Sequence, residues 1–388
     1  MMETVTLDAL DRRLIHALQL DGRLPFSRIA AAVGVPERTV ARRYHRLRSR
    51  LALRVVGLVD GGRTGMLDWI VRIRCAPEAM ETLAALLARR DDTSWIAPLV
   101  GGTELTCMVR TPQPGDDGRP PFDGRRPLDS RRPFFEQLAR TAGVREVDAA
   151  CVLRPVAGVG GWAGRLDALG EAEQRLLRPV SLPPADTADT AEAPPGPGPG
   201  PGPVSAPAEA PPGPAPALAD VPTPALSQAD RALLRALSQD ARADLGRLAA
   251  ATGCSESTVR RRIGQLRESG VLAFEVEVDP ALFGYPLEAL LWLDVPPAGL
   301  RAVSEALAGH PQVAFAALTT GASSVFAMVE CRSVSGLHAY VTGELAALPG
   351  ITGIESAVPQ RRTKRAGPLL APWAEKRAGT ASSRAAAQ

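Results

Sequence analysis

Residues 7–48 read LDALDRRLIHALQLDGRLPFSRIAAAVGVPERTVARRYHRLR, and residues 226–267 read LSQADRALLRALSQDARADLGRLAAATGCSESTVRRRIGQLR. Asp11 of the first stretch corresponds to Asp230 of the second, and this offset of 219 residues (230 − 11) holds without a gap as far as Asp60. A repeat of this length has to be explained before any local pattern is considered. The chain therefore carries one helical module twice.

Each copy of the module is predicted to form three helices. Asp8 and Ser227 are good N-cap residues for the first helix. Gly34 and Gly253 supply the turn after the second helix. The third helix begins near Pro36 in the first copy, since proline suits the first helical position.

The third helix of each copy has one apolar and one polar face. Val40, Tyr44 and Leu47 recur at positions i, i+4 and i+7 and are predicted to pack inward, as are their counterparts in the second copy. A polar helix face in the major groove can reach base edges, and arginine there can pair with guanine. The candidate DNA-binding residues lie on or beside this face: Arg38, Thr39, Arg42, Arg43, Arg46, Ser257, Thr258, Arg261, Arg262 and Gln265.

The overall charge permits nucleic-acid binding without requiring it. The chain of 388 residues has a net charge of only +3. Its lysines are Lys364 and Lys376 alone, so a coding bias toward arginine would also produce arginine-rich helices. A solvated arginine-rich face on a three-helix bundle is therefore the alternative interpretation. Because the face of the first copy is more basic, we expect the first module to contribute more of the salt-dependent affinity.

The cysteines and the N-terminal sequence restrict the class of protein. The five cysteines are widely spaced without a C-x-x-C pair, which disfavours a zinc site or a disulfide framework. Three of them lie in strand-like apolar runs and are predicted to be buried free thiols, as suits a reducing compartment. The chain begins without an apolar signal core, and no run approaches eighteen apolar residues. We expect a cytoplasmic protein without a metal or a cofactor.

About 100 residues of mixed pattern follow each module. In the second half, LEALLWLDV, VAFAALTT, SSVFAMVE and ITGIESAVPQR are typical of strands, and LRAVSEALAGH and LHAYVTGELAAL are typical of helices. The order is β-α-β-β-α-β, and the first half repeats it from DWIVRIR to REVDAACVLR. This order predicts a ferredoxin-like sandwich with one sheet face left uncovered by helices. That face needs a partner.

The expected fold class is α+β, with two winged-type helix-turn-helix domains and two ferredoxin-like domains. A stretch rich in Pro, Ala and Gly, including PPGPGPGPGPV, cannot bury enough apolar surface to become ordered and predicts a disordered linker. The unpatterned stretch TPQPGDDGRPPFDGRRPLDSRR predicts an inserted loop. The predicted divisions are a helix-turn-helix domain (1–56), a ferredoxin-like regulatory domain (57–160), the linker (179–224), a second helix-turn-helix domain (225–275), a second ferredoxin-like regulatory domain (276–365) and a tail (366–388).

At these motifs the chain resembles the Lrp/AsnC (feast/famine) family of bacterial transcriptional regulators. The resemblance lies in LDALDRRLIHALQLDGR and FSRIAAAVGVPERTVARR, in their second copies, and in the β-α-β-β-α-β segments that follow. It implies a sequence-specific regulator that binds double-stranded DNA. Members of the family usually carry one copy and dimerise through the sandwich domains. A tandem chain therefore implies an intramolecular pseudo-dimer or a homo-oligomer formed through those domains.

The resemblance also implies an effector site at the turn between the middle strands of each sandwich. The family usually has Gly there and then a nearby Asp, and many members bind amino acids. Glu104 and Ser324 occupy the Asp-like position in this chain, so the two half-sites differ from the family and from each other. The alternative is a tight hairpin whose glycines serve the backbone. The candidate effector-binding residues are Gly101, Gly102, Thr103, Glu104, Gly321, Ala322, Ser323 and Ser324.

Two further functions are weighed against a specific regulator. Some chains that look like Lrp/AsnC regulators resemble siroheme decarboxylases, which use histidines of the sandwich domain. The four histidines of this chain form no close or symmetric pair, and no G-x-G-x-x-G, P-loop, G-x-S-x-G or H-E-x-x-H motif occurs. We therefore expect no enzyme and no catalytic residue. An architectural protein that bridges DNA without a ligand is the other alternative. The operator, the effector, the direction of regulation and the assembly size stay open.

Overall fold

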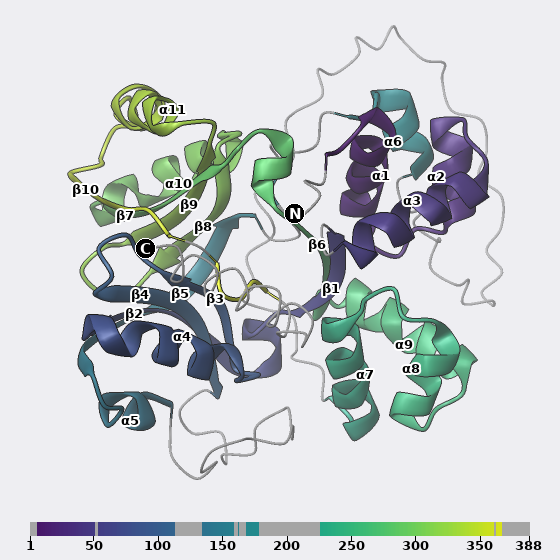
Figure 1. The fold of residues 1–388 in the computed structure, drawn as a ribbon, viewed down its shortest axis with the longest axis horizontal. Coiled ribbons are helices and arrows are strands. Elements are labelled where there is room, and N and C mark those ends of the chain that lie inside the picture. The colour runs from purple at the N-terminus through teal and green to yellow at the C-terminus, as the bar shows by residue number, and fades with distance from the viewer. Residues whose placement is uncertain are drawn as a thin grey trace, which may run out of the picture.

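The computed structural model describes residues 6–50, 53–112, 134–158, 162, 168–177, 226–360 and 362–366. The described elements form the expected α+β fold, with two helical bundles on one side of the molecule and helix-covered sheets on the other (Figure 1). The predicted linker, the inserted loop beyond residue 112 and nearly all of the tail lie outside the described residues. In the described part of the chain, no helix has the length and apolar character needed to cross a membrane.

The two helix-turn-helix units are built alike. Their helices are α1 (Ala9–Leu20), α2 (Phe26–Val33), α3 (Glu37–Ser49), α7 (Gln228–Gln239), α8 (Leu245–Thr252) and α9 (Glu256–Glu268). The Asp8 side chain accepts the N–H of Asp11, whose carboxylate accepts the N–H of Asp8, and Ser227 forms the same capping box with Asp230. Gly34 ends α2 with a φ of 71°, which glycine adopts without strain. Local sequence thus sets the ends of these helices.

A two-stranded antiparallel ribbon joins the two units. β1 (Leu53–Val59) pairs with β6 (Leu272–Val278), and Val56 lies opposite Glu275, its counterpart in the repeat. The strand that follows the three helices of each module therefore pairs with the equivalent strand of the other module. Each unit also packs on a strand from the other half, since α1 contacts β6 and α7 contacts β1. One continuous apolar core spans both units.

Both regulatory halves have the predicted β-α-β-β-α-β order. The first contains β2 (Met66–Cys75), α4 (Met80–Ala88), β3 (Thr93–Pro98), β4 (Glu104–Pro112), α5 (Phe134–Ala139) and β5 (Val144–Ala157). The second contains β7 (Leu287–Asp294), α10 (Leu300–Gly309), β8 (Val313–Thr319), β9 (Val325–Cys331), α11 (Val334–Tyr340) and β10 (Gly353–Ala357). Short helical turns are η1 (Gly62–Thr64), η2 (Pro77–Ala79), η5 (Pro280–Phe283), η6 (Pro297–Gly299) and η7 (Val341–Leu345), the last continuing α11.

Strands from both halves join into one sheet. Among the described residues it has eight strands in the order β10-β7-β9-β8-β5-β2-β4-β3. The first part of β5, as far as Cys151, pairs with β2, and the part from Val152 onward pairs with β8 of the other half. The chain after β10 makes the reciprocal crossing, since the N–H of Thr363 donates to the carbonyl oxygen of Ile96 in β3 at 2.8 Å. Each half therefore contributes a chain segment that pairs with the other half.

The sheet faces without helices pack against each other. This contact is separate from the cores beneath the helices of each half. Its buried residues are Ile70, Leu99, Leu290, Trp292, Phe326 and Met328. The uncovered face that was predicted to need a partner finds it within the same chain. The cysteine prediction is also confirmed, since all five thiols are unpaired and three of them are buried.

The short helix α6 (Glu171–Leu177), which follows the first regulatory half, is not among the predicted elements. It packs against α1 and α2. The N–H of Leu169, just before this helix, donates to Nδ1 of the buried His16 at 3.1 Å. Arg13 forms an ion pair with Glu173. Helix α6 thus attaches the segment after the first regulatory half to helices α1 and α2 of the first helix-turn-helix unit.

Candidate nucleic-acid interface

Helices α3 and α9 turn their polar faces to solvent. The apolar residues predicted to pack inward are at most 7% exposed in both helices. This packing leaves Arg38, Arg42 and Arg46 of α3 exposed, together with Arg261 and Gln265 of α9. Exposed side chains on one face of a helix can enter a groove of DNA without disturbing the core. The structure therefore brings the outward members of the candidate set together on each helix.

Two arginines of the candidate set point toward the first helix of their own unit instead. Arg43 donates to the carboxylates of Asp8 and Asp11, and Nε of Arg262 lies 2.7 Å from Oδ1 of Asp230. The hydrogen bond to Asp8 raises the pKa of Arg43. Burial alone would raise the pKa of Asp230, but the hydrogen bonds to its carboxylate outweigh burial and lower it. Both arginines thus hold the third helix of their unit, α3 or α9, against the start of the first helix; these two helices are called the recognition helices below.

The remaining long side chains differ in how firmly they are held. Nη2 of Arg46 lies 2.5 Å from Oδ2 of the buried Asp11. Oε1 of Gln265, at the corresponding position, accepts hydrogen bonds from two arginines of α9 at 3.1 and 3.4 Å. Arg38 and Arg42 have no hydrogen bond or ion pair with any described residue. These two guanidinium groups are therefore available to a ligand.

The first turns of the two recognition helices also differ. Oγ of Ser255 accepts the N–H of Thr258 at 3.2 Å and lies 3.0 Å from Oγ of Ser257. In α3 the cap position is Pro36, which makes no side-chain hydrogen bond, and Arg38 stands where α9 has Ser257. The hydroxyl of Ser257 is therefore engaged in the helix cap. The two threonines of the candidate set, Thr39 and Thr258, are half-buried at the side.

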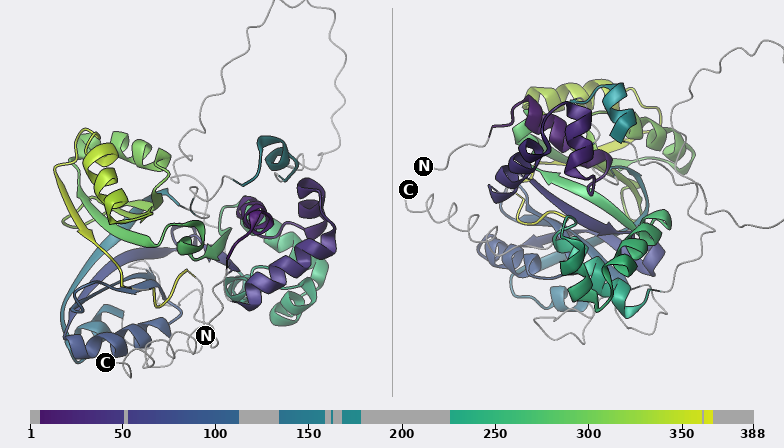
Figure 2. Two further views of the ribbon diagram at one scale, coloured as in Figure 1. Left: turned by 45° about the horizontal axis from the view of Figure 1, so that its top comes forward. Right: turned by 90° about the vertical axis from the view of Figure 1, so that its right-hand side faces the viewer.

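Reciprocal contacts hold the two units in one arrangement. Arg23 donates to the carbonyl oxygen of Ala243 at 3.2 Å, and its counterpart Arg242 donates to that of Leu24 at 3.0 Å. The guanidinium of Arg242 also lies 4.4 Å from the ring centre of Phe26. Two further ion pairs are reciprocal in the same way: Arg48–Asp240 and Arg267–Asp21. The recognition helices are consequently fixed as a pair, one on each side of the ribbon (Figure 2).

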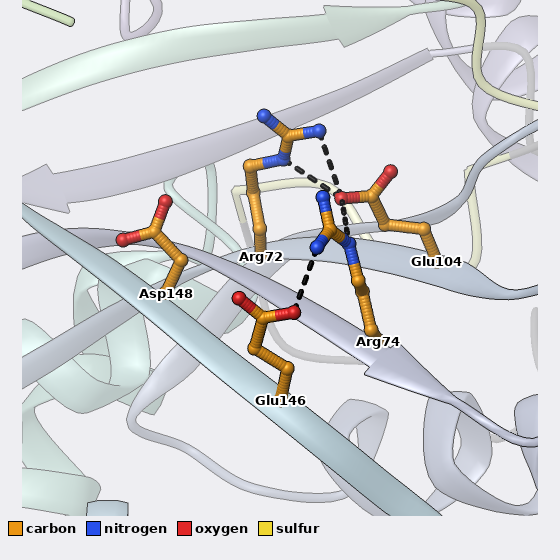
Figure 3. Close-up of a pocket in the computed structure, with 5 residues that line it drawn as sticks. All are labelled: Arg72, Arg74, Glu104, Glu146 and Asp148. Carbon is orange, nitrogen blue, oxygen red and sulfur yellow. Dashed lines mark hydrogen bonds and ion pairs between the residues drawn. The ribbon is translucent and has the colours of Figure 1, made fainter. Parts of the chain in front are cut away.

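The turn between β3 and β4, predicted to bind an effector, borders a charged pocket. Gly101 and Gly102 have φ values of 116° and 70°, and a Cβ added at either would meet nothing within 4 Å. Glu104 accepts a hydrogen bond from Nε of Arg72 at 2.9 Å. Figure 3 shows the pocket and the residues that line it: Arg72, Arg74, Glu104, Glu146 and Asp148. Both signs of charge therefore meet beside this turn.

Arg72 links this pocket to the second regulatory half. Its Nη1 and Nη2 donate to the two Oε atoms of Glu355 at 2.8 and 2.7 Å. Its guanidinium carbon lies 4.2 Å from the ring centre of Trp292, which holds the position in β7 that Arg72 holds in β2. The hydrogen bond between Arg72 and Glu355 raises the pKa of the arginine and lowers that of the carboxyl. The pocket thus adjoins the contact between the halves.

In the corresponding turn of the second half, residues 321–324, the hydroxyl of Ser324 is already hydrogen-bonded to the backbone. Oγ of Ser324 donates to the carbonyl oxygen of Val295 at 2.7 Å and accepts the N–H of the same residue at 2.9 Å. Asp294 and Gly353 stand where the first half has Arg74 and Glu146. The charged pocket is therefore not repeated at this turn.

Family comparisons match both halves of the chain. The sequence pattern of the AsnC-type helix-turn-helix domain matches residues 7–48 and 226–267, and that of the Lrp/AsnC ligand binding domain matches residues 288–369. An uncharacterized HTH-type transcriptional regulator of Pyrococcus abyssi is 33% identical over 134 residues, which are 34% of this chain and 85% of that protein. A regulator of Pyrococcus horikoshii is 31% identical over the same length, with the same coverage.

A solved structure resembles the whole tandem. The crystal structure of the siroheme decarboxylase NirDL gives a TM-score of 0.54 and covers 97% of this chain and 99% of its own. The two sequences are 12% identical. At this identity the likeness concerns the fold alone, and it extends the shared fold from one half to the tandem arrangement.

Proposed function

The chain belongs to the Lrp/AsnC family of helix-turn-helix transcriptional regulators, and on that premise we propose that it regulates transcription by sequence-specific binding to double-stranded DNA. The proposal rests chiefly on the pair of recognition helices, whose exposed faces carry Arg38, Arg42 and Arg261. Arginine in the major groove can pair bidentately with guanine, and arginine beside the groove can hold phosphates. Because the ribbon fixes the pair, both helices can address one duplex.

We assign two roles within the candidate set. Residues on or beside the exposed faces contact DNA: Arg38, Thr39, Arg42, Arg46, Ser257, Thr258, Arg261 and Gln265. Arg43 and Arg262 act as positioning residues, because they are half-buried and their guanidinium groups are bound to Asp11 and Asp230 within the same unit. Arg46 also pairs with Asp11, but its side chain stays exposed on the outward face. Loss of a positioning arginine should lower the stability of the unit as well as its affinity for DNA.

Selection of genomic DNA fragments by the purified full chain, followed by sequencing of the retained fragments, tests the proposal. An enriched short motif is expected, and the double variant Arg42→Ala/Arg261→Ala should abolish the enrichment. The matched control is Arg301→Ala, which removes an arginine that is 87% exposed. It belongs to α10, which lies among the regulatory elements on the other side of the molecule from α3 and α9 (Figure 1). Uniform retention would favour an architectural DNA-bridging protein. No retention by folded protein would refute DNA binding.

We further propose a small-molecule effector site at the charged pocket of the first half. The pocket places the guanidinium groups of Arg72 and Arg74 beside the carboxylates of Glu104, Glu146 and Asp148. Guanidinium groups bind carboxylates bidentately, and carboxylates accept hydrogen bonds from ammonium groups. A zwitterionic α-amino acid offers both partners. The proposed stoichiometry is one ligand per chain, since the second half has Asp294 and Gly353 in place of the pocket's arginine and glutamate.

A thermal-shift series with the common amino acids tests the effector site. A ligand that binds the folded chain raises the melting temperature by mass action. The variant Glu104→Gln should lose this rise, whereas Ser324→Ala, the matched change at the other turn, should retain it. A rise that both variants keep would place the effector elsewhere, and no rise with any amino acid would exclude this ligand class.

We also propose that the chain acts by binding and not by catalysis. Nδ1 of His16 accepts the N–H of Leu169, and Nδ1 of His310 lies 2.9 Å from the hydroxyl oxygen of Tyr340. These two histidines thus have structural partners in different domains. The likeness to a siroheme decarboxylase concerns the fold alone. Incubation with siroheme, monitored by absorbance and by release of carbon dioxide, would refute the proposal if turnover occurred.

A further inference from the structure

We propose that this chain recognises a non-palindromic DNA site in one fixed orientation, because its two linked recognition helices present different side chains. This inference rests on the proposed DNA binding and adds the symmetry and the polarity of the site. It follows from three observations: the pair is made within one chain, the outward faces differ, and the differing side chains have different hydrogen-bonding capacities.

The pair of recognition helices has a fixed composition. Its members come from one chain, and the ribbon is centred on Val56 opposite Glu275, so α3 lies on one side of the ribbon and α9 on the other. The reciprocal bonds of Arg23 and Arg242 to the facing unit maintain that arrangement. A homodimer presents two identical faces, but this chain always presents one α3 and one α9.

The outward faces of α3 and α9 share one arginine and differ elsewhere. Five positions on each helix lie opposite the buried stripe, and their residues are all exposed or half-buried. In α3 they are Arg38, Arg42, His45, Arg46 and Ser49, and in α9 they are Ser257, Arg261, Gly264, Gln265 and Glu268. The outward face of α3 thus carries three arginines, whereas the outward face of α9 carries one arginine and one glutamate. Arg260 adds charge only to the flank of α9.

The position of Arg38 separates the two faces most sharply. It lies in the first turn of α3, the part of a recognition helix that contacts base edges, and it has no partner among the described residues. Its guanidinium can donate to both O6 and N7 of guanine. Ser257 at the same position of α9 has a short side chain, and its hydroxyl lies 3.0 Å from the cap hydroxyl of Ser255. The helix α3 is therefore suited to a guanine that α9 does not require.

The second differing position also favours different bases. Arg46 is exposed and offers the guanidinium N–H groups that its ion pair with Asp11 does not use. Gln265 offers an amide, whose donor and acceptor match the N7 and N6 edge of adenine. Gln265 in addition holds Arg261 at 3.4 Å, while the corresponding Arg42 is free of described partners. We expect a guanine-rich half-site beneath α3 and a half-site with fewer guanines beneath α9. Reversing the duplex would place Arg38 over the wrong bases.

Selection from a random duplex library with the full chain and with Ser257→Arg/Gln265→Arg tests the inference. The double variant gives α9 the same arginines as α3 at exposed positions, so it adds contacts without removing any from the core. The wild-type chain should enrich a motif with unequal halves, and the variant should enrich a palindrome made from the guanine-rich half. Replacing the guanine assigned to Arg38 should weaken wild-type binding by about 5- to 150-fold. The equivalent change in the other half should have a smaller effect.

The possible outcomes separate this inference from the function on which it rests. A palindrome enriched by the wild-type chain would overturn the inference and leave specific DNA binding intact. An asymmetric motif that the double variant does not make symmetric would also overturn it, because the asymmetry would then have another origin. Binding without any enriched motif, or no binding, would refute the proposed function itself. Arg301→Ala should enrich the wild-type motif unchanged.

Discussion

Replacing Lys364 by methionine is expected to stabilise the protein at neutral pH, and this gain is expected to disappear as the pH rises. The side chain is 3% exposed, and its Nζ donates to the carbonyl oxygen of Arg90 at 2.5 Å. Burial lowers the pKa of Lys364 from 10.5 to about 8, although nearby acidic groups, Asp91 first among them, oppose this effect. The folded state therefore carries a cost for holding this ammonium group away from water.

The size and sign of the effect follow from proton binding. At pH 7 the lysine is largely protonated in both states, and the difference between 10.5 and about 8 corresponds to a cost of about 3 kcal/mol in the folded state. Between these values the unfolded state still binds a proton that the folded state has released, so stability rises with pH. By pH 9.5 about 2 kcal/mol of the cost is relieved. Methionine removes the charge but leaves the carbonyl of Arg90 without this donor, a loss of about 1 kcal/mol.

Urea unfolding of both proteins at pH 7 and pH 9.5, with a reductant present and tryptophan fluorescence as the signal, measures this difference. The methionine variant should be more stable by about 2 kcal/mol at pH 7 and of nearly equal stability at pH 9.5. Burial raises the pKa of Cys331 to about 11, so such thiols ionise in this range only when the chain unfolds; they are common to both proteins and cancel in the comparison. An identical pH dependence of the two proteins would show that Lys364 does not titrate as argued.

Three further predictions concern the contacts between the halves and the DNA surface. Arg242→Ala removes two backbone hydrogen bonds and the stacking on Phe26, and should lower the free energy of unfolding in urea by about 3 kcal/mol; wild-type stability would mean that this tie contributes nothing. Arg72→Ala, which loses Glu355 and the stacking on an indole, should cost about 2 kcal/mol in the same assay, and an unchanged midpoint would contradict that role. Replacing Arg38 and Arg42 by alanine should reduce the slope of log K against log salt by about 0.9 for each residue that contacts a phosphate. DNA titration at several salt concentrations measures this slope, and an unaltered slope would exclude phosphate contacts by both.

Local sequence was sufficient to predict the helical modules and the order of the regulatory elements. The helix ends and the buried face of α3 depend on residues only a few positions apart, so they can be predicted from local sequence. Examples are the capping residues Asp8 and Ser227 and the glycine after α2. The same holds for the alternation of strands and helices that gives each half its β-α-β-β-α-β order. The exposed faces of α3 and α9 followed from the helical period once the buried stripe was recognised.

The contacts that join distant segments could not be predicted from the sequence. The sequence did not show that Arg43 pairs with Asp8 and Asp11, because those aspartates lie at the start of another helix, more than thirty residues away. No periodicity shows that β1 pairs with β6, or that β5 changes partners after Cys151, since a strand has the same pattern whichever neighbour it takes. The stacking of Arg72 on Trp292 depends on how the sheet faces of the two halves pack together, which the sequence pattern does not show.

The pairing of the two regulatory halves within one chain has a consequence for the behaviour of the chain at low copy number. Two separate subunits must meet before they can act as a pair, so the fraction that is paired falls as their concentration falls. Here the partner is always present, because it is translated on the same polypeptide and is attached at a high effective concentration. The pairing of the two halves therefore does not depend on the concentration of the chain.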